Sequence, residues 1–187
     1  MNLRKMIEKA LALIEELNPD SEMLTDDPDI SAKMKNVINQ VMFELARFKK
    51  IPKYVEMPVE EGQLVRFEDV AAVCGRQLYQ LGHVSGAKFT TKANGTVLKI
   101  LEAGVLEIDF FVYPERIEED TDIDAYTFDL SDDALEIMPY GIAADLLKSD
   151  ISAAYGKTYA ERYEMMLQRL DSRYNMGGIH MEGGFDV

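Results

Sequence analysis

The spacing of apolar residues changes twice along this chain of 187 residues, and this change limits the fold more than any other feature. Near both ends, apolar residues recur at intervals of three and four, which is typical of amphipathic helices. From about Tyr54 to Tyr113, short runs separated by turn residues are typical of strands. The sequence therefore predicts an α+β fold in which strands are inserted between two helical regions.

Two helices are predicted before the strands. The first should end at Asn18-Pro19-Asp20, and the second should run to Phe48 and end at Ile51-Pro52. Lys49 and Lys50 are expected in the last turn of the second helix, where cations favour the negative helix end. The apolar stripe of the first helix is Leu3, Met6, Ile7, Ala10, Leu11, Ile14 and Leu17. That of the second is Ile30, Met34, Val37, Ile38, Val41, Met42, Leu45 and Phe48.

The middle region predicts a small antiparallel sandwich or barrel, because several short strands follow one another closely. Asn94-Gly95 favours a two-residue hairpin turn between residues 88–93 and 96–101, since both residues readily adopt positive φ. Residues 107–113 alternate, with Ile108, Phe110 and Val112 on one face. Residues 70–81 fit either a strand or a helix, and the pattern does not decide between them.

Two further helices are predicted after residue 130. Ser131-Asp132-Asp133 can cap a short helix that runs to Met138. Pro139 is expected in the first turn of a new helix, since an interior proline loses a backbone hydrogen bond. Gly156 should break that helix before a last one, whose apolar positions are Tyr159, Tyr163, Met166, Leu167 and Leu170.

The apolar stripes of these four helices need cover, and the simplest arrangement packs the helices together. This predicts a four-helix core with an inserted antiparallel β-sandwich or barrel-like domain. The expected boundaries are residues 1–53 for the N-terminal helical pair, 54–130 for the strand-rich insertion and 131–174 for the C-terminal helical pair. Residues 175–187 hold four glycines and no periodicity, so we expect a flexible tail.

The negative charge is concentrated in one segment. The net charge of the chain is −14, and residues 115–150 alone hold two basic and twelve acidic groups, a net of −10. This balance argues against tight binding of free DNA and of anionic membranes. Glu118, Glu119, Asp120, Asp122 and Asp124 form either an ordinary solvated surface or the lining of a passage from which anions are repelled.

No motif in the sequence carries catalytic chemistry. His83, in an expected loop, and His180 stand far apart, so they give no zinc-ligand spacing. Asp120, Asp122 and Asp124 resemble the start of a calcium loop, but that template fails at Ala125 and Ser131. Cys74 is expected to be buried and inert. The sequence therefore predicts no enzyme, no catalytic or metal-binding residue and no cofactor.

One cysteine permits no intramolecular disulfide, which fits a cytoplasmic origin. The sequence shows neither a signal peptide nor an apolar run long enough to span a membrane.

Tyr155, Tyr159 and Tyr163 recur at intervals of four and so share one helical stripe. Such a stripe is usually core or a helix–helix contact. The alternative is a subunit interface, where tyrosine is enriched because it supplies both area and a hydrogen bond. Phe185, in the glycine-rich tail, is the fourth candidate for such an interface.

Three stretches resemble the head–tail adaptor proteins of tailed phages, the gatekeeper or connector family related to tail tubular protein A. They are IDFFVYP at 108–114, LEIMPYGIAADLL at 135–147 and YAERYE at 159–164. The direct similarity covers about residues 105–174, and the order of helices, strands and helices extends it over the whole chain. Residues 18–29 and the first helix match the family less well.

The resemblance implies a virion structural protein of a phage or prophage, assembled in the bacterial host cytoplasm and placed in the virion neck. Members form homo-oligomeric rings, commonly dodecamers, that bind the portal protein and tail proteins. DNA passes through the ring without being gripped, and the C-terminal segment often becomes ordered in the portal. The resemblance implies no catalytic residue. The alternative hypothesis is a small acidic binding or regulatory module that senses cations through Asp120, Asp122 and Asp124.

Overall fold

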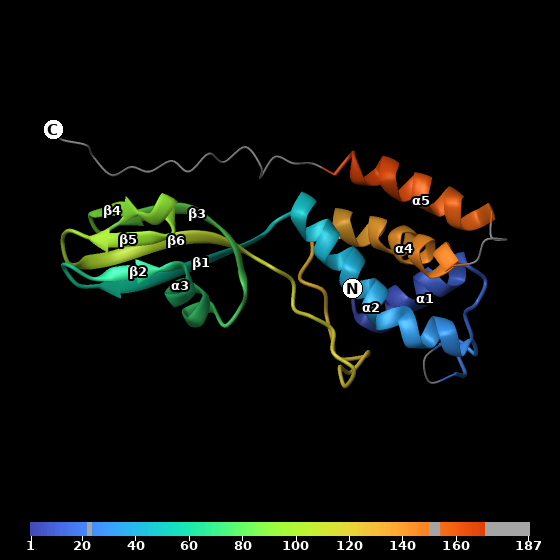
Figure 1. The fold of residues 1–187 in the computed structure, drawn as a ribbon. Helices are drawn as coiled ribbons and strands as arrows, with labels where there is room; N and C mark the ends of the chain where they lie inside the picture. Colours follow the sequence, from blue (N-terminus) through green and yellow to red (C-terminus); the bar gives the residue numbers. More distant parts are fainter. Residues whose placement is uncertain (22–23, 150–153, 171–187) are drawn as a thin grey trace. The chain divides into compact units, whose positions relative to one another are not determined.

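The computed structural model describes residues 1–21, 24–149 and 154–170, and it confirms the α+β fold. Two small antiparallel sheets of three strands each lie between N-terminal and C-terminal helices in the chain order (Figure 1). The chain divides into two compact units. The helical unit comprises Met1–Lys49 and the described part of Pro114–Ser172, and the strand unit is Lys50–Tyr113. In the described part of the chain, no helix has the length and apolar character needed to cross a membrane.

Helix α1, Leu3–Leu13, buries the predicted apolar stripe as far as Leu11. Its N-cap is Asn2, whose side-chain oxygen accepts a hydrogen bond from the Lys5 amide. The helix ends earlier than Asn18-Pro19, because Glu15 adopts φ 61° and the Glu16 amide donates back to the Leu11 carbonyl at 3.0 Å. This left-handed ending commonly uses glycine, so the residue type at position 15 gives no signal for it.

Helix α2, Pro28–Phe48, begins with proline at its first position and with the Asp27 side chain accepting from two amides. The prediction for its C-terminal end was wrong in detail. Lys49 is the C-cap rather than a member of the last turn, and its ammonium pairs with Asp133 at 3.0 Å. Strand β1, Ile51–Val59, then starts where Ile51-Pro52 was expected only to end a helix.

The strand unit contains two sheets with the orders β1-β6-β3 and β2-β5-β4. Strand β6, Gly104–Val112, pairs along its whole length with β1 and buries Ile108, Phe110 and Val112, as predicted. The remaining strands are β2 (Leu64–Arg66), β3 (Leu78–Gly86), β4 (Phe89–Lys92) and β5 (Val97–Ile100). The ambiguous stretch 70–81 is divided between helix α3, Phe67–Cys74, and the start of β3.

Two connections, one between β3 and β4 and one between β4 and β5, contain residues at positive φ. At Gly86, φ is +92° and an added Cβ would lie 2.1 Å from the Val105 carbonyl oxygen, so only glycine fits where β3 gives way to β4. The hairpin between β4 and β5 contains Asn94-Gly95, as predicted. Its connection is longer than two residues, because the 3-10 turn Ala93–Gly95 places Ala93, Asn94 and Gly95 all at positive φ.

Helix α4, Asp132–Leu146, corrects the prediction that Pro139 starts a new helix. Pro139 lies inside a continuous helix, and Met138, Pro139 and Ile142 are all buried. An interior proline costs about 3 kcal/mol in an isolated helix. Here α4 packs against α1, α2 and α5, so burial on several faces offsets that cost (Figure 1).

Helix α5, Ala154–Leu167, follows the short 3-10 turn Leu147–Ser149 and contains Gly156, which the sequence predicted as a break. Tyr163 and Leu167 are its buried positions among those described, and the helix packs against α4. The predicted tail of residues 175–187 lies outside the described residues.

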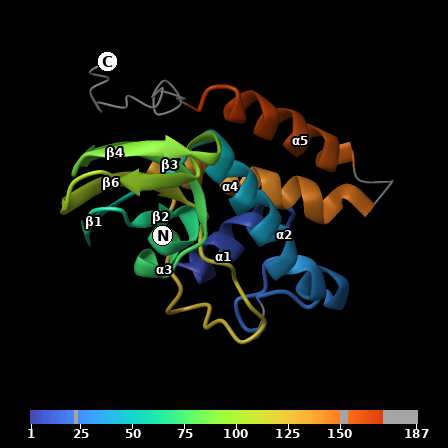
Figure 2. The ribbon, with the colours of Figure 1, turned by 60° about the vertical axis from the view of Figure 1, so that its left-hand side comes forward.

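The segment between β6 and α4 belongs to the helical unit, although the sequence pattern placed residues 114–130 with the strands. Its backbone hydrogen-bonds to α1, and Ile117, Phe128 and Leu130 are buried. Figure 2 shows this segment beside α1 and α2. No strand period is present there because the segment is held by the start of α1 and by side chains of α1 and α2, with one isolated bridge, Asn2 to Thr127, of the strand type.

Candidate functional site

The acidic segment 115–124 is fixed to helix α2 by one buried amide. Asn39 Nδ2 donates to the Ile117 carbonyl at 2.8 Å, and the Ile117 amide donates to Asn39 Oδ1 at 2.9 Å. Asn39 is only 6% exposed. Both polar groups of the Ile117 backbone are thereby satisfied away from water, so this pair fixes the start of the loop.

A second anchor is the ammonium group of Lys35, one turn before Asn39 on α2. Lys35 Nζ donates to the backbone carbonyl oxygens of Glu118, Glu119 and Thr121. The Glu118 amide in turn donates to Thr121 Oγ1 at 2.8 Å. The cation therefore holds the loop backbone, and the carboxylates of Glu118 and Glu119 remain exposed.

The third anchor joins the far end of the segment to helix α1. Arg4 makes a two-point contact with the Asp124 carboxylate, and Nη2 lies 2.9 Å from Oδ2. The hydrogen bond from Arg4 lowers the pKa of Asp124, and the same contact raises the pKa of Arg4. The Leu3 and Arg4 amides also donate to the carbonyls of Tyr126 and Ile123 at 3.0 and 2.9 Å, which satisfies free groups at the start of α1.

The five predicted acidic residues differ in the contacts that their carboxylates make. Asp122 Oδ1 accepts from the Asp124 amide at 2.8 Å, and Asp124 is paired with Arg4, so both shape the loop. Glu118 lies 3.8 Å from Arg116. Glu119 and Asp120 are exposed and take part in no ion pair among the described residues. The fixed loop thus presents Glu118, Glu119 and Asp120 to solvent.

The anchoring residues were not predicted as part of this site. The sequence did contain one signal, because Asn39 lies among the apolar positions of α2, directly after Ile38 and three residues before Met42. A buried amide within an apolar stripe requires a partner. Arg4 and Lys35 gave no such signal, since cations on exposed helix faces are ordinary.

The predicted tyrosine stripe runs from the interior of the helical unit to its surface. Tyr163 is 8% exposed, and its hydroxyl donates to Glu44 Oε2 at 2.9 Å. Burial raises the pKa of Tyr163, and the hydrogen bond to Glu44 raises it further. The Tyr159 hydroxyl donates to the Leu13 carbonyl, whereas Tyr155 is 72% exposed. Phe185, the fourth residue predicted for an interface, lies outside the described residues.

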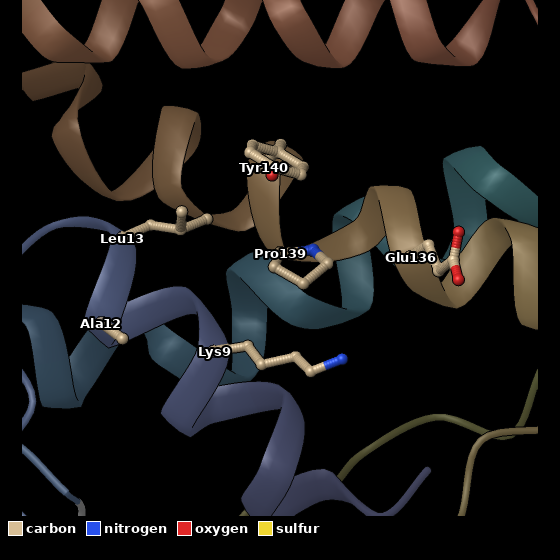
Figure 3. A pocket seen from close by; sticks show the side chains of 6 residues that line it. All are labelled: Lys9, Ala12, Leu13, Glu136, Pro139 and Tyr140. Atoms are coloured by element: carbon tan, nitrogen blue, oxygen red, sulfur yellow. The ribbon is translucent and has the colours of Figure 1, made fainter.

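A pocket of about 380 Å³ lies between α1 and α4. Figure 3 shows Lys9, Ala12 and Leu13 contributed by α1, and Glu136, Pro139 and Tyr140 by α4. Arg162 of α5 stacks on the ring of Tyr140, with its guanidinium carbon 4.4 Å from the ring centroid. The polar groups of Lys9 and Glu136 have opposite charges, so the pocket has no strong preference for a cation or an anion.

Metal-ligating side chains do not converge in the part of the chain that the structure describes. No group of three His, Cys, Asp or Glu residues there could hold a metal ion, so Asp120, Asp122 and Asp124 do not form one. Cys74 is half-buried at the end of α3 rather than fully buried. His83 lies in strand β3, not in the loop predicted for it, and His180 lies outside the described residues.

Neither a protein-family model nor a curated protein matches this chain. Its function is therefore inferred from its residues and geometry.

Proposed function

We propose that this protein is a structural adaptor of the tailed-phage neck, forming a ring between the portal and the tail through which DNA passes. One observation carries most weight in this proposal. The longest stretch that resembles the adaptor family, residues 135–147, makes up most of α4, the helix that contacts α1, α2 and α5. The resemblance therefore concerns the centre of the helical unit rather than an exposed loop.

The proposal includes a finer description of the fold. Helices α1, α2, α4 and α5 would act as one four-helix core that builds the wall of the ring. The two sheets would act as an inserted sandwich or barrel-like domain. The buried inward positions of both sheets, among them Phe110 and Ile100, support this description.

The acidic segment has a defined role in this proposal. Glu118, Glu119 and Asp120 would face the channel, where their negative charge keeps DNA from adhering as it passes. The three anchors at Asn39, Lys35 and Arg4 support this role, because they hold the loop backbone from which these side chains project. A ring would repeat this charge around the passage.

The proposed partners are further copies of the chain, the portal protein and tail proteins. Tyr155 is the best interface candidate of the stripe because most of its ring is exposed. Tyr159 and Tyr163 serve mainly to attach α5, since their hydroxyls are bonded within the helical unit.

The test is reconstitution with the portal protein encoded in the same genome. Purified chain and portal are mixed and examined by light scattering and electron microscopy, with the portal alone as control. We expect co-migration and extra ring density at one end of the portal. A chain that stays separate from the portal at concentrations well above those of assembly would contradict the proposal. Adjacent portal, capsid or terminase genes would support it independently.

A further inference from the structure

The outer face of the β1–β6 ladder is exposed and acidic. Along β1, the outward positions are Pro52, Tyr54, Glu56 and Pro58, and all four are exposed. Along β6, Val105, Glu107 and Asp109 are exposed and alternate with the buried residues Leu106, Ile108 and Phe110. Because successive side chains of a strand point to opposite faces of the sheet, these exposed residues of the two strands all lie on the same face.

The strand register brings the polar groups of this face together. Tyr54 lies directly opposite Asp109, and Glu56 lies directly opposite Glu107. The Tyr54 hydroxyl donates to Glu56 Oε1 at 3.0 Å, and Ser85 Oγ of β3 donates to Glu107 Oε2 at 3.1 Å. Partial burial raises the pKa of Tyr54 to about 12, assisted by its hydrogen bond to Glu56 and by the neighbouring charges of Glu107 and Asp109.

This pairing of like charges works against folding of the isolated sheet. Two carboxylates directly opposite each other in an antiparallel ladder are destabilising. Among the described residues, no ion pair involves Glu56, Glu107 or Asp109. Lys50 lies beside the same ladder, but its ammonium donates to Gln80 at 2.7 Å and lies over the rings of Tyr79 and Phe111.

We propose that this face, Tyr54, Glu56, Glu107 and Asp109, is a docking surface for an arginine-bearing segment of another protein. Guanidinium groups bind carboxylates through two parallel hydrogen bonds and stack on aromatic rings, and the face offers both kinds of partner. Its two cross-strand pairs are separated by two residues, about 7 Å. Arginines at alternate positions of an extended segment have the same spacing.

The face, rather than the strand edge, is the docking element. Strand β1 lies at the edge of its sheet, where an incoming strand would ordinarily add. Pro52 and Pro58 have no amide hydrogen to donate, and proline at an edge opposes strand addition. The segment therefore lies across the side chains. This inference does not depend on the adaptor proposal, because it uses only the strand unit.

The test uses the full chain and a labelled synthetic octapeptide of alternating arginine and serine. Binding is measured by fluorescence anisotropy, and the same peptide with citrulline in place of arginine controls for charge. The double variant Glu56→Gln, Glu107→Gln should bind at least tenfold more weakly. The matched variant Glu60→Gln, Glu61→Gln removes the same charge from the nearby exposed turn and should bind as the wild type does. Tyr54→Thr, which keeps all carboxylates, should also weaken binding.

Several results would overturn the inference. Equal weakening in both double variants would mean that the peptide responds only to the overall negative charge. Amide shifts confined to residues 118–124 in a ¹⁵N-labelled chain would place the peptide on the other acidic surface. Self-association of the wild type that disappears in the Glu56→Gln, Glu107→Gln variant would make a second copy the occupant. Thermal unfolding of each variant checks that the fold is retained.

Discussion

The ring of Tyr163 occupies the space that a side chain at Gly141 would need. A Cβ added to Gly141 would lie 2.8 Å from Tyr163 Cε2 and 2.9 Å from Val41 Cγ1. Real Cβ atoms do not approach other atoms this closely, so the glycine sets how near α2 and α5 come to α4. The glycine costs helix propensity in the middle of α4, and the close packing offsets that cost.

Gly141→Ala should therefore destabilise the protein by about 2 kcal/mol, despite the better helix propensity of alanine. Urea unfolding followed by circular dichroism gives the difference. Gly156→Ala in α5 is the control, because its Cβ would lie 3.1 Å from Leu147 Cβ and no nearer than 3.5 Å to the Leu147 backbone, a smaller overlap than at Gly141. Equal stability of Gly141→Ala and wild type would show that the helices separate without cost.

The contact between Asn39 and Ile117, which anchors the acidic segment, gives a second prediction. Asn39→Ala removes both hydrogen bonds to Ile117 and leaves two buried backbone groups without partners. A cost of about 2 kcal/mol is expected for such groups. Hydrogen exchange at the Ile117 amide should accelerate at the same time. Asn36→Ala, on the exposed side of the same helix, should change neither stability nor exchange beyond about 0.5 kcal/mol.

The sequence predicted those parts of the fold that depend on local periodicity. The stripe from Leu3 to Leu11 and the alternation from Ile108 to Val112 were read correctly because burial repeats with the element's own period. Pro139 was misread, since the local cost of an interior proline is outweighed by packing of α4 against three helices. The pattern of neighbouring residues does not contain that long-range contribution.

The candidate site was less accessible to prediction. The acidic residues were visible from charge alone, but how the segment that carries them is held depends on Arg4, Lys35 and Asn39. Asn39, Lys35 and Arg4 are separated in the chain from their partners in the acidic segment by 78, 83 and 120 residues, respectively. The same holds for Glu56 and Glu107, which become neighbours only through the β1–β6 register.

The ion pair between Arg4 and Asp124 predicts a contribution to stability that depends on pH. The pKa of Asp124 is lowered in the folded state, so the contribution is present above the unfolded pKa and disappears as pH falls through the folded value. The loss should begin near the ordinary aspartate pKa of 3.8 and continue below it. Asp124→Asn should therefore lose less stability than the wild type between neutral pH and about pH 3.

Urea midpoints at the two pH values measure this difference. Adding Arg4→Gln to the Asp124→Asn variant is the control, because the pair is already broken and the pH dependence should not change further. An Asp124→Asn variant with the acid sensitivity of the wild type would show that the pair contributes nothing in solution. Both side chains are partly exposed, so added salt should reduce the effect.

The buried hydroxyl of Tyr163 predicts a loss of stability at the opposite end of the pH scale. Burial raises the pKa of Tyr163 above its ordinary value of 10.0, so the unfolded chain loses this proton first. The stabilisation is complete below about pH 10 and is lost as pH rises further toward the folded pKa.

Tyr163→Phe should cost about 1 kcal/mol at neutral pH through loss of the hydrogen bond to Glu44. Its stability should then fall less than that of the wild type between pH 9 and about pH 11, because phenylalanine has no proton to lose. Tyr155→Phe, at the exposed end of the stripe, is the matched control and should follow the wild type at both pH values. Parallel alkaline loss in Tyr163→Phe and the wild type would show that the Tyr163 hydroxyl is solvated rather than bonded to Glu44.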